Sequence, residues 1–312
     1  MAAANFSGIE KQSKLVETYC STGFAEEIHN QLRYHSVINI LLSITAFLGN
    51  TLILAALRTD SSLNPPSKLL LQSLAVTDLF VGLIAQPLLA IFELSLLSER
   101  WNVCLFAAFI SSISGPLFGG ATLLTMTAIG VDRLLALLLG LRYRQVVTLK
   151  RMRLVVIAIW LGSTAVAAVQ LWNFAVLRWY SYLVIPLCVA TSASCYIKIF
   201  RTLAYLRHQT HAGPTNQLDM ARYKNAVSSA LWLQFTLIIC YLPFTLVNMV
   251  IVVSTDYPQS AMPTSLFVIR SFAIVLTYLN SSLNPILYCW KITPVRQEVK
   301  ATIRRVLCYL LS

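Results

Sequence analysis

The sequence predicts an all-α fold, a bundle of seven transmembrane helices followed by a short amphipathic eighth helix. Two observations predict it. Hydrophobic residues make up 57% of the 312 residues and charged residues only 12%, which is about half the charged fraction of a soluble domain. Apolar segments long enough to cross about 30 Å of hydrocarbon recur along the chain.

These segments are expected to be helices, because a lone strand in lipid would leave its backbone groups unpaired. None shows the alternating hydrophobicity of a membrane β-barrel strand. In order, the segments are Ser36–Leu57, Leu69–Phe92, Cys104–Leu139, Leu154–Leu177, Tyr180–Leu203, Ala226–Val253 and Ser265–Cys289. The predicted organisation is an amino-terminal segment (1–35), a seven-helix domain (36–290) and a carboxy-terminal helix and tail (291–312).

The placement of Lys and Arg orients the bundle, because cytoplasmic loops retain positive charge. The connections after segments one, three and five, the tail, Arg133 and the last turns of segment five (Lys198 and Arg201) hold 18 of the 24 Lys and Arg residues, and the amino end, the other connections and the first turns of segment seven (Arg270) hold six. We therefore expect a plasma-membrane protein with its amino end outside and its carboxy end in the cytoplasm. The net charge of +12 then faces anionic lipid, and no nucleic-acid partner is expected.

Cysteine usage gives no sign of a metal site, since the seven cysteines show no CxxC spacing and no cluster with His. Only Cys20 and Cys104 fall on the predicted outer side, where they either form one disulfide or remain free thiols. Asn5, in the sequon Asn5-Phe6-Ser7, is a candidate glycosylation site on the same side.

The residues after the seventh segment predict the eighth helix. Thr293 can cap it and Pro294 suits its first turn. Apolar residues occupy one face and basic residues another, namely Ile292, Val295, Val299, Ile303 and Val306 against Lys291, Arg296, Lys300 and Arg304. This pattern is typical of a helix lying on the inner leaflet of the lipid bilayer, and Cys308 near its end is a candidate for palmitoylation.

Polar residues inside apolar segments are costly in lipid and are therefore functional candidates. They are Asn50, Asp78, Asp132, Arg133, Asn280 and Asn284. Pro243 and Pro285 would free backbone carbonyls in the sixth and seventh segments. The sequence contains no paired catalytic carboxylates, nucleophile triad or P-loop, so an enzyme is not expected.

Six motifs follow one another in a fixed order: Gly49-Asn50, the LAVTD ending at Asp78, Asp132-Arg133-Leu134, Trp160, the CYLP ending at Pro243, and the NPILY from Asn284 to Tyr288. This set resembles the rhodopsin family (class A) of G-protein-coupled receptors. The resemblance implies that an extracellular ligand's binding reaches a heterotrimeric G protein through outward movement of helix six. The alternatives are a small polytopic transporter or channel, which would need a polar path or inverted repeats, and a decoy that binds ligand without coupling.

For Arg133 the resemblance implies that Asp132 holds it at rest and that it contacts the G protein on activation, whereas the alternative is a snorkelling anchor. Many members also restrain this Arg with an acid on helix six. Here that position is near Tyr223, and the nearest acid, Asp219, lies about one turn earlier. We therefore predict appreciable ligand-independent signalling.

Around Asp78 the resemblance implies a water-filled pocket for an allosteric sodium ion, the one cofactor considered. Oxygen ligands suit such a hard cation. The implied ligands include Asn50, Thr122, Asn280 and Asn284. The alternative is a water-bridged polar network without an ion.

The resemblance also implies an activation switch at Tyr241, where the family most often has Trp, hinged at Pro243. Leu237 stands where a Phe is usual. Tyr288 would be an inner gate that swings toward Tyr196 and Arg133, whereas the alternative is that both tyrosines only fill the core.

The ligand class is narrowed by what is missing. Segment seven has no Lys between Ser265 and Trp290, and Tyr278 stands where an opsin bonds retinal. Gly115 stands where an amine receptor has its acid. Neither a retinal-binding opsin nor a receptor for biogenic amines is therefore expected. The expected ligand pocket contains Gly115, Tyr241, Arg270, Ile274 and Tyr278.

Charged residues near the outer ends leave several ligand classes open. Arg178 and Arg270 would suit an acidic or lipid headgroup and Glu93 and Glu99 a basic peptide, unless all are solvated rim charges. The short second outer connection without Cys is similar to that of melanocortin, cannabinoid and lysophospholipid receptors, and the cytosolic half resembles adenosine receptors.

Overall fold

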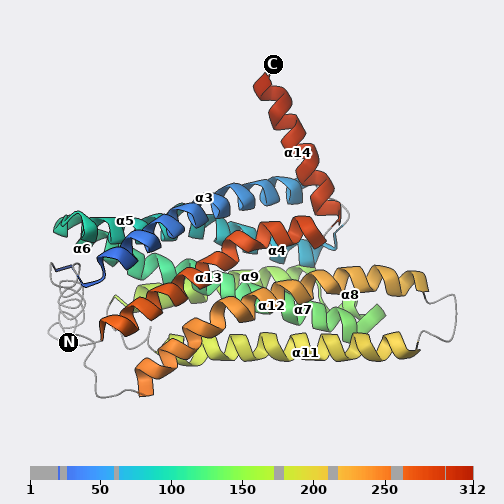
Figure 1. Cartoon of the computed structure of the whole chain (residues 1–312). Coiled ribbons are helices and arrows are strands. Elements are labelled where there is room, and N and C mark those ends of the chain that lie inside the picture. Colours follow the sequence, from blue (N-terminus) through green and yellow to red (C-terminus); the bar gives the residue numbers. More distant parts are fainter. Residues whose placement is uncertain are drawn as a thin grey trace.

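The structure is a computed structural model, and it describes residues 20–21, 27–59, 63–171, 179–209, 217–253, 263–291 and 293–311. Every regular element in these ranges is helical. Seven helical stretches are long and apolar enough to span a membrane: His29–Thr59, Pro65–Leu97, Trp101–Leu139, Leu149–Val169, Tyr180–Thr202, Trp232–Ile251 and Thr264–Lys291. The predicted bundle of seven spans is confirmed, and its helices lie side by side along one axis (Figure 1).

Three spans contain a wider π-helical turn. The second consists of α4 (Pro65–Phe80), η1 (Val81–Ala85) and α5 (Gln86–Leu97), the third of α6 (Trp101–Ser114), η2 (Gly115–Gly119) and α7 (Gly120–Leu139), and the fifth of η4 (Tyr180–Val184) and α11 (Ile185–Gln209). Pro87, Pro116 and Pro186 lie in or just after these turns. A proline ring clashes with the carbonyl four residues earlier in an α-helix, and the wider turn accommodates this clash.

The other spans are single helices, α3 (His29–Thr59), α9 (Leu149–Val169), α12 (Gln217–Val253) and α13 (Thr264–Lys291), and η3 (Gly140–Arg142) and α8 (Tyr143–Val146) connect the third span to the fourth. Several begin earlier than predicted, because hydropathy marks only the part of a helix that crosses lipid. At its beginning, α9 is capped by Thr148, whose Oγ1 accepts a hydrogen bond from the Arg151 N–H at 3.4 Å. The predicted end of the fourth segment, Leu177, lies outside the described residues.

Polar groups are placed inside the bundle and apolar groups outside. Asn50, Asp78, Asn280 and Asn284 are completely buried. Large apolar side chains project outward from several spans, among them Leu41, Leu161 and Leu187. This inverted arrangement is the one expected where lipid replaces water around the bundle.

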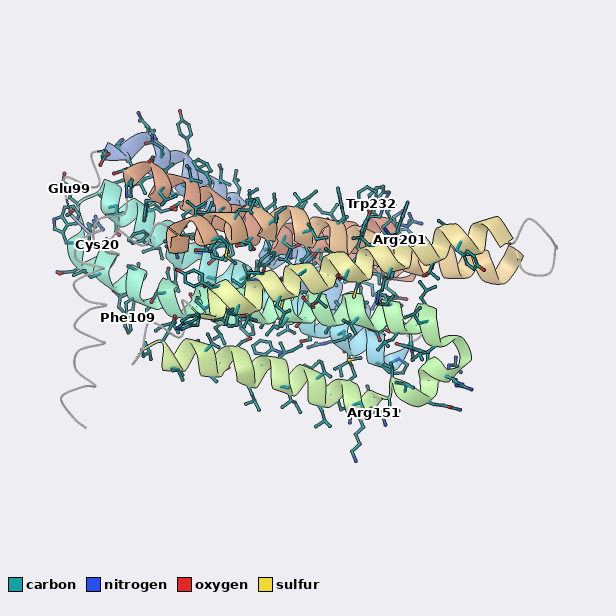
Figure 2. The ribbon with its side chains drawn as sticks, turned by 90° about the horizontal axis from the view of Figure 1, so that it is seen from below. Cys20, Glu99, Phe109, Arg151, Arg201 and Trp232 are labelled. Carbon is teal, nitrogen blue, oxygen red and sulfur yellow. A yellow bond between two sulfur atoms is a disulfide. The ribbon has the colours of Figure 1, made fainter. Side chains whose placement is uncertain are left out.

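The bundle has two distinct ends, named here the Cys104 end and the Arg133 end. Figure 2 shows Cys20 and Glu99 at the first and Arg151 and Arg201 toward the second. The last helix, α14 (Thr293–Leu311), leaves the Arg133 end and turns away from the bundle axis (Figure 1). Val295 and Val299 are buried, and Glu298 accepts a hydrogen bond from Thr59 at 2.8 Å, which attaches α14 to α3.

Candidate functional site

A cavity of about 330 Å³ lies between the helices toward the Cys104 end, lined by every span except the fourth. The five residues predicted for a ligand pocket, Gly115, Tyr241, Arg270, Ile274 and Tyr278, all line it. Its other walls are largely apolar and include Leu89, Phe92, Leu123, Ile185 and Phe244. A concave, mainly apolar space with a few polar groups is typical of small-molecule sites.

One wall of this cavity carries a buried acid and histidine. His35 of α3 and Glu93 of α5 are each only 3% exposed, and His35 Nδ1 lies 2.8 Å from Glu93 Oε1. Asn39 donates to the other carboxylate oxygen at 3.3 Å, and Phe272 meets the imidazole edge-on. The expectation that Glu93 is a solvated rim charge is wrong, because the second span continues to Leu97 and places Glu93 against α3.

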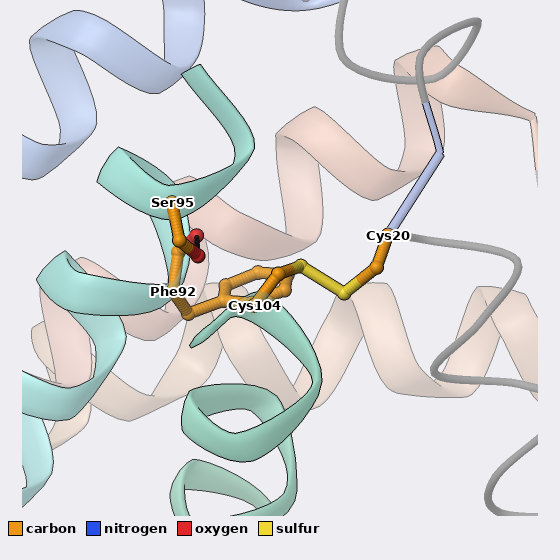
Figure 3. Close-up of a disulfide and its surroundings, with 4 residues drawn as sticks. All are labelled: Cys20, Phe92, Ser95 and Cys104. Carbon is orange, nitrogen blue, oxygen red and sulfur yellow. Dashed lines mark hydrogen bonds between the residues drawn. A yellow bond between two sulfur atoms is a disulfide. The ribbon is translucent and has the colours of Figure 1, made fainter. Parts of the chain in front are cut away.

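A disulfide attaches the amino-terminal segment to the cavity's end of the bundle. Cys20 is bonded to Cys104 at the beginning of α6, beside Phe92 of α5 (Figure 3). Ile28 and Leu32 pack in the same apolar cluster and line the cavity. Ile28, directly before α3, is therefore part of the cavity's surroundings.

Glycines of the third span make room for tyrosines around the cavity. A Cβ on Gly120 would lie 2.7 Å from the Tyr180 hydroxyl, and one on Gly115 would lie 3.1 Å from that of Tyr278. Tyr241, from α12, donates to the backbone carbonyl of Gly119 at 3.2 Å. The predicted switch residue is thus bonded directly to the third span.

Deeper in the bundle, the Asp78 carboxylate accepts three hydrogen bonds from residues that the structure describes. Thr122 and Ser281 donate to one oxygen at 3.0 and 2.8 Å, and Asn284 donates to the other at 2.7 Å. Asn280 contacts Met126 Sδ at 2.9 Å instead. The structure therefore brings Thr122 and Asn284 to Asp78 as expected, adds Ser281, and directs the Asn280 amide elsewhere.

Two side-chain amides donate hydrogen bonds to backbone carbonyls whose usual helical N–H donor is missing, because the residue four positions later is proline. Pro285 lacks the N–H that would reach Ser281 O in an α-helix, and Asn50 donates to that carbonyl at 3.0 Å. Likewise, Pro116 has no N–H for Ser112 O, which accepts from Gln170 of the fourth span at 2.8 Å. The expectation that Pro285 frees a carbonyl agrees with this contact.

At the Arg133 end, Asp132 is the centre of a buried cluster. Tyr143 of α8 donates to its carboxylate at 2.6 Å, Ser67 of α4 donates at 3.0 Å, and Arg133 lies 3.3 Å away. Burial and the bond to Asp132 raise the pKa of Tyr143 to about 12. The phenol therefore stays protonated and remains a donor to Asp132 at neutral pH.

Comparison with known proteins agrees with this architecture. The family model described as 7 transmembrane receptor (rhodopsin family) matches residues 49–179 and 172–288, well over half of the chain. The chain belongs to this family. A receptor family is thereby shown, rather than a transporter or channel family.

The receptor's curated relatives include three adenosine receptors. Adenosine receptor A2b of Gallus gallus is 23% identical and covers 87% of this chain and 88% of its own length. Adenosine receptor A3 of Ovis aries is 26% identical (83% and 86%), and that of Canis lupus familiaris is 27% identical (83% and 87%). The receptor is therefore similar to these proteins along most of its length.

Among the described residues, neither of the receptor's two predicted signalling tyrosines is hydrogen-bonded to Asp132. Tyr288 is 2% exposed, and within the described part of the chain its hydroxyl has no hydrogen-bond partner. Tyr196 stacks against Phe200 and Phe235. Their expected approach to Arg133 stays a prediction.

The remaining predicted residues are exposed or lie outside what the structure describes. Cys308 on α14 is exposed. Asn5 and Arg178 lie outside the described residues, and so do the side chains of Asp219 and Tyr223.

Sequence reasoning missed His35, Tyr143 and Ser281. His35 and Tyr143 lie near segment boundaries, where polar residues are usually solvated, and Ser281 is a small hydroxyl beside the more prominent Asn280. Ser281 carried a weak signal because it is adjacent to Asn280, whereas His35 and Tyr143 each lie ten or more residues from the nearest expected polar site.

Proposed function

We propose that this receptor binds a small extracellular ligand in the cavity and activates a heterotrimeric G protein when α12 moves outward at the Arg133 end. In this proposal the amino end lies outside the plasma membrane and the Arg133 end faces the cytoplasm. Ligand and G protein would favour the same conformation, so each would increase the affinity for the other.

The observation that carries the proposal is the arrangement around Arg133. Its side chain is 22% exposed, and its ion-pair partner among the described residues is Asp132 at 3.3 Å. Asp132 is held independently by Tyr143 and Ser67. Arg133 can therefore leave the pair for a cytosolic partner while the carboxylate keeps two other donors.

Between the two ends, Tyr241 and Pro243 on α12 and Asn284, Pro285 and Tyr288 on α13 would transmit the change. Tyr241 lines the cavity and bonds to the third span, so a ligand that displaces its ring would act on α12 directly. Pro243 lies two residues further along the same helix, where the missing N–H permits bending.

Nucleosides are the first ligand class to test. The relatives are named adenosine receptors, and a cavity of about 330 Å³ suits a small molecule. We expect the ligand to meet His35, whose Nε2 is buried without a partner among the described residues. With Nδ1–H directed to Glu93, a neutral His35 would present Nε2 as an acceptor for a ligand N–H or O–H group.

The Asp78 cluster suits an allosteric sodium ion. Carboxylate, hydroxyl and amide oxygens are the ligands of hard cations, and Oδ1 of both Asn280 and Asn284 lacks a partner among the described residues. When bound, the ion would neutralise Asp78, while Thr122, Ser281 and Asn284 orient the carboxylate.

Cys308, being exposed on α14, remains a candidate for palmitoylation.

The test is nucleotide exchange on G proteins in membranes that contain the receptor. Arg133→Ala should abolish both basal and ligand-stimulated exchange, because the side chain proposed to contact the G protein is removed. Arg144→Ala is the matched control, since Arg144 is an exposed arginine at the same end. Equal exchange by wild type and Arg133→Ala, at equal surface expression, would refute the proposed coupling.

A further inference from the structure

Among the residues whose side chains the structure describes, two hydrogen bonds connect α12 to the third span. Gln234 Nε2 donates to Met126 O at 2.8 Å, and the Tyr241 hydroxyl donates to Gly119 O at 3.2 Å. On each helix the two positions are seven residues apart, which is about two turns. Both bonds therefore lie along a single seam between α12 and the third span.

Gly130 makes the Gln234 bond possible. In an α-helix the Met126 carbonyl accepts the N–H of Gly130, and its second lone pair remains available to the Gln234 amide. A Cβ on Gly130 would lie 2.5 Å from Gln234 Nε2 and 2.7 Å from its Cδ. The glycine and the glutamine thus form a matched pair.

The surroundings make this bond costly to break. Gln234 is completely buried, with Leu233 and Leu237 nearly so on either side along α12. Its Oε1 has no partner in the part of the chain that the structure describes. Separating the helices would leave an amide among apolar side chains, and burying an unpaired polar group is unfavourable.

The Asn50 and Gln170 amide-to-carbonyl bonds described above connect different helices. Asn50 joins α3 to α13, and Gln170 joins the fourth span to the third. Of the three, only Gln234 lies on the helix that the proposed function requires to move.

We propose that Gln234 is a positioning residue that holds α12 against the third span in the resting receptor. Family members often use instead an acid on helix six, which restrains the arginine that corresponds to Arg133. The inference rests on the proposed function, because only under that function does movement of α12 change signalling. It adds that the restraint acts within the membrane and at a backbone carbonyl, so no acidic side chain on α12 is required.

The first experiment measures ligand-independent nucleotide exchange per surface receptor. Gln234→Leu should raise it roughly three-fold to fifteen-fold, the range given by hydrogen bonds between membrane helices. Gly130→Ala should raise it in the same direction by displacing the amide. Thr236→Val is the control, because among the described residues Thr236 Oγ1 donates to Trp232 O within α12, at 2.9 Å, and not to the third span. Unchanged exchange in both test variants, with Arg133→Ala still reducing it, would overturn the inference and leave the proposed function intact.

The second experiment does not depend on a G protein. Spin labels on cysteines placed at Val146 of α8 and Lys224 of α12, in a Cys308→Ser background, report the distance between the two helices. Gln234→Leu should increase the population at longer distances, and Thr236→Val should not. Unaltered distances would overturn the inference, whereas altered distances without nucleotide exchange by any variant would sustain it and refute the proposed coupling.

Discussion

At the scale of residues, the same physical solution recurs in three places. A side-chain amide donates to a backbone carbonyl that a proline or glycine four residues later leaves accessible, as in the Asn50–Ser281, Gln170–Ser112 and Gln234–Met126 pairs. In lipid no water is available to satisfy a freed carbonyl. Helix irregularity and polar contact between helices are therefore two aspects of one requirement.

Tyr143→Phe tests how the Asp132 cluster is held. The substitution removes the 2.6 Å bond to the carboxylate and leaves the ring in place. A hydrogen bond to a charged group contributes about 1.5–3 kcal/mol, so the melting temperature of the purified receptor should fall at neutral pH. Tyr34→Phe is the control, since Tyr34 is 70% exposed. A melting temperature for Tyr143→Phe equal to that of wild type would show that the bond does not stabilise the fold.

The raised pKa of Tyr143 sets the pH range of this effect. The phenol ionises near pH 10 when unfolded and at about 12 in the folded receptor. Below about pH 10 both states are protonated and the stabilisation is fully present; it is lost as pH rises from about 10 to about 12. The difference between wild type and Tyr143→Phe should therefore be constant at neutral pH and shrink above about pH 10.

Single residues differ in how far the sequence predicts them. Asp78, Thr122 and Asn284 were predicted together because the family resemblance implies a pocket around Asp78, and they are together in the structure. Glu93 was misplaced because its partner His35 is 58 residues away in the chain and no local pattern pairs them. Tertiary partners of this kind depend on helix rotation, which hydropathy does not encode.

At the scale of elements, the apolar segments predicted seven helices well and their ends poorly. Hydropathy follows contact with lipid, whereas a helix ends where capping and backbone propensity end it. The π-turns of η1, η2 and η4 were not predicted either. Pro116 and Pro186 lie in or just after two of these turns, but the sequence alone does not say whether a proline produces a kink, a break or a wider turn.

The contact between the third and fourth spans yields an element-scale prediction. Gln170→Leu removes the donor to Ser112 O, and such bonds in membranes contribute about 0.6 kcal/mol, at most about 1.7. Pro116→Ala returns an N–H donor to the third span, so Ser112 O would be hydrogen-bonded even without Gln170. A double-mutant cycle on thermal stability should therefore show a smaller loss from Gln170→Leu in the Pro116→Ala background, and equal losses in both backgrounds would contradict it.

At the scale of the whole molecule, two sites occupy opposite ends of one bundle. The cavity lies toward the Cys104 end, and the Asp132 cluster lies at the Arg133 end. The third span and α12 run between them and are bonded at Gly119 and Met126. This long-range arrangement was predictable from motif order, and the five residues predicted for the pocket line the cavity. The buried His35–Glu93 pair on its wall was not predictable, because two spans bring these residues together only on folding.

The disulfide has a whole-molecule consequence, because it joins residues 84 positions apart and so encloses the first two spans in one loop. Cross-links of long loops stabilise folded proteins by about 2–4 kcal/mol. Cys20→Ser, Cys104→Ser and the double variant should therefore lower the melting temperature equally, and a reductant should lower that of wild type to the same value without affecting the variants. Cys308→Ser, which removes an exposed free thiol, should leave it unchanged. If the double variant were less stable than either single one, the two cysteines would be acting separately, and the amino-terminal segment would be held at the cavity by packing of Ile28 and Leu32 rather than by the bond.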